Sequence, residues 1–154
     1  MKKRIFFWVL LGLILFFIWG NSMLSMEDSK SFSSAVGDFL SKIFGLESGD
    51  GGGDTMIGGI GLRKIAHFVE FCALGVIFSL ILRLYIKDTC ITLLSLALFG
   101  FIVPMIDETI QIFSGRGPMV SDVWIDVGGY ALGCILLYFG LYLGRLYLKN
   151  NHKN

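Results

Sequence analysis

The sequence has little charge, little proline and few cysteines for its length. Asp, Glu, Lys and Arg make up 16% of the 154 residues, whereas soluble domains carry about 25%. The three cysteines show no paired spacing, so the pattern indicates neither a disulfide framework nor a cysteine metal cluster. The basic residues form no stripe, which argues against a nucleic-acid-binding protein.

Long apolar segments are what the sequence has instead. A helix needs about 20 mostly apolar residues to cross a bilayer, and the segments that qualify are 5–24, 65–86, 90–113 and 123–143. The first follows "MKKR", as a signal peptide would, but it is long and no A-x-A site follows, so we expect a retained helix. The predicted fold class is all-α: a polytopic membrane protein with a four-transmembrane-helix bundle, forming a single domain over residues 1–150.

The basic residues near the span ends predict the orientation of the chain. Those that fall on one side of a four-span chain are Lys2, Lys3, Arg4, Arg83, Lys87, Arg145, Lys149 and Lys153. Because Lys and Arg are enriched in cytoplasmic loops, we expect this side to be the cytoplasm. Both termini are then cytoplasmic.

The one long connection, residues 25–62, lies on the outer side in this topology. Val36, Phe39, Leu40 and Ile43 recur at helical spacing, which predicts a short amphipathic helix at the interface. The stretch "GLESGDGGGDTMIGGIG" follows, and its many glycines predict a flexible linker. It lacks the G-K-[ST] of a phosphate-binding loop.

The fourth span carries two G-x-x-x-G pairs. Gly129 is paired with Gly133, and Gly140 with Gly144. Small residues let helix backbones approach closely inside a membrane. We therefore expect both pairs to lie against neighbouring helices.

Ionisable and amide side chains gather at the outer ends of spans two, three and four. They are Arg63, Lys64, His67, Glu70, Asp107, Glu108, Gln111, Arg116, Asp122 and Asp126. Spacings of three and four residues put most members of each helix on one face, and Arg116 lies in the turn between spans three and four. A lone charge at the bilayer centre costs at least ~2.5 kcal/mol. We therefore expect these groups to converge inside the bundle, in a polar cluster at the extracytoplasmic side.

Two interpretations of this cluster stay open. Buried ion pairs can simply fix how helices pack, and Asp122 is also a candidate N-cap for span four. Ionisable residues within spans are, however, functional-site candidates by default. In that interpretation the candidate catalytic residues are His67, Glu70, Asp107, Glu108 and Asp126. The candidate ligand-binding residues are Arg63, Lys64, Gln111, Arg116 and Asp122.

The same residues resemble the VanZ-like family. The motifs "RKIAHFVEFCALG", "DETIQIF", "SGRG" and "SDVWIDVGGYALG" follow one another in the family's order within residues 5–143. The resemblance implies a multi-pass protein of the bacterial plasma membrane. The family is named for a protein associated with low-level resistance to teicoplanin, a lipidated glycopeptide that acts outside the cell. Membership alone does not make this chain a resistance factor.

Two classes of function fit these residues. The first is recognition of a lipid headgroup, a cell-wall precursor or a lipoglycopeptide antibiotic at the outer leaflet, with Arg63 and Arg116 binding anionic groups. The alternative is an intramembrane hydrolase or transferase acting on a lipid-linked or phosphate-bearing substrate. His67 is then the general acid or base and Glu70 orients it, while Ser114 and Ser121 are weak candidates for a nucleophile.

The expected partners are membrane lipids or an amphiphilic envelope ligand, and not nucleic acid. One histidine with several carboxylates suits Mg²⁺, Mn²⁺ or Zn²⁺ by ligand type. A lone histidine is more often hydrogen-bonded, so no metal is predicted, and the cofactor and the oligomeric state stay open. Transport is a third class, disfavoured because the inner half lacks the polar groups that a pathway needs.

Overall fold

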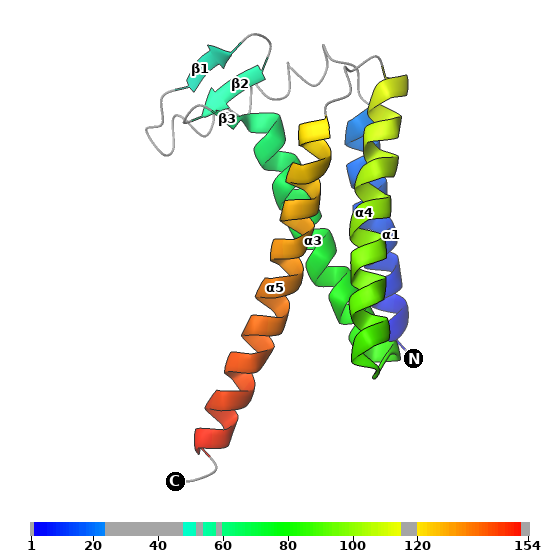
Figure 1. The fold of residues 1–154 in the computed structure, drawn as a ribbon, viewed down its shortest axis with the longest axis vertical. Coiled ribbons are helices and arrows are strands. Elements are labelled where there is room, and N and C mark those ends of the chain that lie inside the picture. Colours follow the sequence, from blue (N-terminus) through cyan, green and yellow to red (C-terminus); the bar gives the residue numbers. More distant parts are fainter. Residues whose placement is uncertain (1, 24–47, 52–53, 58–59, 115–119, 152–154) are drawn as a thin grey trace.

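The fold was analysed in a computed structural model, which describes residues 2–23, 48–51, 54–57, 60–114 and 120–151. The helices are α1 (Lys2–Met23), α3 (Leu62–Tyr85), α4 (Thr89–Phe113) and α5 (Val120–Asn151). The strands are β1 (Ser48–Gly51), β2 (Asp54–Ile57) and β3 (Ile60–Gly61). The helices run alternately in opposite directions, and α1 begins and α5 ends at the end opposite the sheet (Figure 1). The predicted amphipathic helix at residues 36–43 and Arg116 lie outside the described residues.

All four helices are long and apolar enough to cross a membrane, which confirms the predicted fold class. Three of them agree with the predicted spans to within three residues at each end. The fourth differs, because α5 continues past the predicted end at residue 143 to Asn151. A helix can extend beyond the apolar layer when its sequence holds no proline or other breaker, and "GRLYLKNN" holds none.

The side chains are distributed as a membrane requires. The buried polar and charged residues are Ser22, His67, Ser79, Asp107, Glu108, Gln111 and Asp126. Large apolar side chains point outward instead; Phe16 is 78% exposed and Phe113 is 87% exposed. Exposed apolar surface is unfavourable in water and is accommodated by lipid chains. The four helices therefore present hydrocarbon outward and enclose their polar groups.

An apolar core fills the bundle away from the polar end. Ile18 of α1 packs there with Phe71 and Leu74 of α3, and none of the three is measurably exposed. The rings of Phe78 on α3 and Phe99 on α4 stack with their centroids 3.8 Å apart. This packing confines most of the buried polar side chains to one end of the bundle.

Helices α3 and α5 share the most extensive contact in the structure. A Cβ atom added at Gly133 would collide with the carbonyl oxygen of Cys72, and one at Gly129 with that of Phe68. The first G-x-x-x-G pair therefore lies at a close helix contact, as expected. The expectation for Gly140 and Gly144 is wrong, because no atom of a neighbouring described helix would lie within 4 Å of a Cβ at either position. The physical reason is that α5 diverges from the other helices toward its C-terminal end (Figure 1).

A proline interrupts the hydrogen bonding of α4. Pro104 is fully buried in the interior of this helix and has no N–H to donate to the carbonyl of Gly100, one turn earlier. Gly100 is itself covered by the ring of Tyr130 from α5, which would lie 2.6 Å from an added Cβ. The acidic end of α4 thus begins directly after a missing backbone hydrogen bond.

Short strands occupy part of the segment for which a flexible linker is expected. They form one antiparallel sheet in the order β1-β2-β3, with Ser48 opposite Ile57 and Ile57 opposite Ile60. Pairing satisfies backbone groups that a free linker leaves to water, and Thr55 and Ile57 favour extended backbone. Strand β3 leads directly into α3, so the sheet lies at the polar end of the bundle (Figure 1).

Candidate functional site

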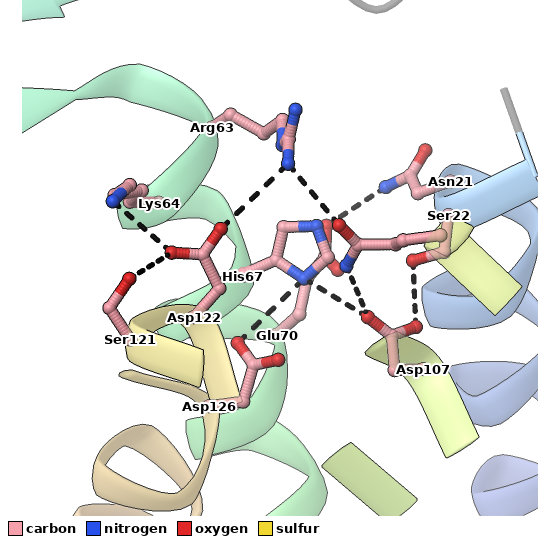
Figure 2. Close-up of polar contacts among 11 residues, drawn as sticks. Asn21, Ser22, Arg63, Lys64, His67, Glu70, Asp107, Ser121, Asp122 and Asp126 are labelled. Carbon is pink, nitrogen blue, oxygen red and sulfur yellow. Dashed lines mark hydrogen bonds and ion pairs between the residues drawn. The ribbon is translucent and has the colours of Figure 1, made fainter. Parts of the chain in front are cut away.

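Helices α3, α4 and α5 each place one side chain at the centre of the polar cluster. His67 Nδ1 lies 3.7 Å from Asp107 Oδ2 and 3.8 Å from Asp126 Oδ1. One donor atom from each of the three residues lies within 4.8 Å of the others, and all three residues are buried. Figure 2 shows both carboxylates directed at the same edge of the imidazole. The close packing of α3 on α5 brings two of the three residues together, because Phe68 follows His67 and Gly129 lies about one turn after Asp126.

Hydrogen bonds from two helices hold the carboxylate of Asp107. Ser22 Oγ donates to Asp107 Oδ1 at 2.7 Å, and Gln111 Nε2 donates to Asp107 Oδ2 at 2.9 Å. The side-chain amide oxygen Oε1 of Gln111 accepts a hydrogen bond of 3.2 Å from Arg63 Nη2. Gln111 therefore connects the buried carboxylate to a basic side chain nearer the surface.

Two basic residues share one carboxylate at the outer edge of the cluster. Lys64 Nζ lies 3.1 Å from Asp122 Oδ1, and Arg63 Nη2 lies 4.0 Å from Asp122 Oδ2. Ser121 Oγ also donates to Asp122 Oδ1 at 3.1 Å. Because α5 begins at Val120, Asp122 lies in its first turn and is not the N-cap that the sequence allowed. A carboxylate in the first turn is still stabilised by the positive end of the helix dipole.

Glu70 and Glu108 complete the set of acids on α3 and α4. Glu70 accepts a hydrogen bond of 2.9 Å from Asn21 Nδ2 of α1, and Glu108 is buried next to Asp107. The sequence predicts that Glu70 orients His67. In the structure the carboxylates of Asp107 and Asp126 face Nδ1, so these two acids join Glu70 as candidates for orienting the ring. Each of the three helices predicted to form the site therefore contributes at least one acidic side chain to it.

The first helix also contributes to the site, which the sequence analysis missed. Asn21 and Ser22 lie at the end of α1 and bond to Glu70 and Asp107. The signal was present in "IWGNSM", where two polar residues end an apolar run at the same depth as the cluster. Four helices, rather than three, position the polar groups.

A pocket opens from the cluster at this end of the bundle. Its empty volume is about 230 Å³, including the open mouth, and it is lined by Arg63, Lys64, His67, Gln111, Asp122, Ile125 and Asp126. The hydroxyls considered as nucleophiles are engaged elsewhere, since Ser121 bonds to Asp122 and Ser114 Oγ donates to the carbonyl oxygens of Ser22 and Ile110. The pocket has basic groups at its mouth and imidazole and carboxylate groups at its base. Imidazole and carboxylate groups are ligands that bind divalent cations.

A family model described as VanZ/LLP1 matches residues 7–142. The chain belongs to the VanZ/LLP1 family. This confirms the resemblance seen in the motifs, and the matched range includes every residue of the pocket. No curated protein and no solved structure matches the chain.

Proposed function

We propose that this VanZ/LLP1-family protein binds the charged headgroup of an amphiphile at the membrane face where the pocket opens. The observation that carries the proposal is a polar pocket at one end of a bundle whose outer surface is apolar. An amphiphile has the same division, with a charged head and hydrocarbon chains. Its head can bind at the mouth of the pocket while its chains stay in the bilayer beside the helices.

The charges at the mouth favour an anionic group. Arg63 and Lys64 bring two positive charges, and within the described part of the chain they share one carboxylate, that of Asp122. Their side chains are 24% and 36% exposed, so both are accessible from outside. Guanidinium groups bind phosphate and carboxylate with two parallel hydrogen bonds. Arg63 is therefore the residue expected to contact the anionic part of the ligand.

The expected membrane is the bacterial plasma membrane, with both termini in the cytoplasm. The mouth then faces the outer leaflet, where phospholipids, cell-wall precursors and lipoglycopeptides such as teicoplanin present charged groups. All three combine an anionic group with a lipid anchor, which is the chemistry proposed for the ligand. A role in low-level teicoplanin resistance would follow from binding the antibiotic or the lipid beside it.

Binding by the purified protein tests the proposal. The protein is placed in phosphatidylcholine nanodiscs with a chelator, and short-chain phosphatidylglycerol and teicoplanin are titrated separately. Replacing Arg63→Gln should weaken binding of the recognised probe about tenfold or more, since a hydrogen bond to a charged group contributes about 1.5–3 kcal/mol. Arg83→Gln, at the other end of the same helix, is the matched control and should bind as the wild type does. Equal binding by the Arg63 and Arg83 variants, or no binding of either probe by the wild type, would contradict the proposal.

An intramembrane enzyme is the second candidate, favoured by the setting of His67. His67 lines the pocket, and its Nε2 lies on the side of the ring toward Arg63 (Figure 2). A histidine in this position is suited to act as a general base on a bound substrate or water. Turnover of a lipid-linked substrate that is lost in His67→Gln, with headgroup binding retained, would support this candidate over recognition alone.

A further inference from the structure

The geometry points to a divalent-cation site formed by His67 Nδ1, Asp107 and Asp126. The sequence predicts no metal here, because a lone histidine in an apolar helix is usually hydrogen-bonded. The structure adds two carboxylates from two other helices to that histidine. The inference concerns the base of the pocket and does not rest on the proposed headgroup binding.

The distances between His67 Nδ1 and the two carboxylates fit ligands arranged around an ion better than hydrogen bonds between these groups. His67 Nδ1 lies 3.7 Å and 3.8 Å from the two carboxylates, beyond the 2.7–3.2 Å of ordinary N–H···O bonds. Ligands about 2.0–2.2 Å from a tetrahedral Zn²⁺ lie roughly 3.4 Å from one another. The two distances from His67 Nδ1 are close to this value, and the three donors, all within 4.8 Å of one another, would surround such an ion after moving closer together.

Asp126 supplies a second, independent observation. Its side chain is 2% exposed, and its Oδ2 has no hydrogen-bond partner among the described residues. A buried carboxylate oxygen without a partner is costly, and Figure 2 shows this carboxylate directed toward His67 and Asp107. A cation among the three residues would satisfy it.

The charge balance and the surrounding hydrogen bonds agree with this assignment. A divalent cation held by two carboxylates and a neutral imidazole gives a site of zero net charge, which a low-dielectric interior tolerates best. Ser22 and Gln111 donate to Asp107, as outer-shell groups orient metal-binding carboxylates. One nitrogen and carboxylate oxygens suit Mn²⁺ or Zn²⁺.

Titration of the purified full-length protein with Mn²⁺ alone tests the site. Mn²⁺ prefers oxygen and nitrogen donors to thiolates, so the cysteines do not compete for it. After metals are removed with a chelator and the chelator is dialysed away, binding is followed by loss of the electron paramagnetic resonance signal of free Mn²⁺. The wild type should bind one ion per chain. Asp126→Asn and His67→Gln should each weaken binding tenfold or more, whereas Asp88→Asn, at the opposite end of the bundle, should not.

Thermal unfolding provides the second measurement for each variant. Mn²⁺ should raise the unfolding temperature of the wild type and of Asp88→Asn, and leave those of Asp126→Asn and His67→Gln unchanged. Binding of Mn²⁺ by Asp126→Asn and His67→Gln with wild-type affinity, or no saturable binding by the wild type, would overturn the site. Headgroup binding is measured separately, in the presence of chelator. A failure of the metal site therefore does not change the outcome of the headgroup experiment, and the reverse also holds. If Asp126→Asn does not fold, His67→Gln alone decides, by the same two readouts.

Discussion

Ser22 of α1 donates a buried hydrogen bond of 2.7 Å to the carboxylate of Asp107 on α4. The two residues are far apart in the chain, and the bond joins the first helix to the base of the pocket. Ser114 Oγ of the α4 C-cap adds a second contact, to the carbonyl oxygen of Ser22. The first span is therefore part of the site and not only an anchor.

Ser22→Ala should destabilise the fold and loosen Asp107. Interhelical hydrogen bonds in membranes contribute about 0.6 kcal/mol on average and up to about 1.7, and a fully buried bond to a carboxylate should lie in the upper part of that range. The free energy of unfolding, measured in detergent, should fall by about 1 kcal/mol. Ser95→Ala is the matched control, because Ser95 Oγ donates a hydrogen bond within α4, to the carbonyl oxygen of Ile91. Equal losses in both variants would mean that the Ser22 bond contributes nothing specific.

Gly133→Ala should separate α3 from α5. The added methyl group would collide with the carbonyl oxygen of Cys72, which is backbone and cannot rotate away. Overpacking of this kind costs about 1–3 kcal/mol and should weaken any ligand binding at the site above it. Gly140→Ala, on the same helix with nothing within 4 Å, should leave the free energy of unfolding unchanged or raise it slightly. A neutral Gly133→Ala would show that this contact is looser than described.

Asn21 and Glu70 should be energetically coupled. Their side chains bond at 2.9 Å between α1 and α3, and each residue can be truncated to alanine. A double-mutant cycle in the free energy of unfolding should give a coupling of about 0.5–2 kcal/mol. Asn21 and Asp88, which lie at opposite ends of the bundle, serve as the comparison cycle. Coupling that is zero for Asn21 and Glu70 would contradict the described bond.

Single cysteines at Ser48→Cys and Asn151→Cys should report opposite sides of the membrane. The background lacks the three native cysteines, which are all free, with Cys90 exposed, so their replacement removes no disulfide. A membrane-impermeant maleimide should label position 48 in intact cells and position 151 only after lysis. Labelling of both positions from outside is incompatible with four spans and cytoplasmic termini.

Composition and spacing were sufficient to predict the membrane architecture. Apolar runs of about 20 residues have few alternatives, since a helix is the structure that satisfies their backbone in lipid. The meeting of His67, Asp107 and Asp126 also follows from the sequence, because each lies near the same end of its span. Charged groups at the same depth avoid contact with lipid chains by facing one another in the interior of the bundle.

Other features depend on how the helices cross, which spacing alone does not reveal. Both G-x-x-x-G pairs look alike in the sequence, yet only Gly129 and Gly133 contact α3, because α5 diverges beyond them. Asn21 and Ser22 are uncharged and lie at the end of an apolar segment, so the sequence does not distinguish them from ordinary polar residues that end a span. Their roles depend on which helix faces them, and the contact of α1 with both α3 and α4 supplies that information.

Pro104 gives α4 a point of bending that α3 and α5 do not have, since neither contains a proline. The two turns that follow it carry Asp107, Glu108 and Gln111. The backbone of α4 has far less contact with α3 than that of α5 has. A slight tilt at Pro104 would change the distance from Asp107 to His67 without disturbing the glycine contacts between α3 and α5. The proline thus allows the acidic end of α4 to shift relative to His67 while the packing of α3 against α5 stays in place.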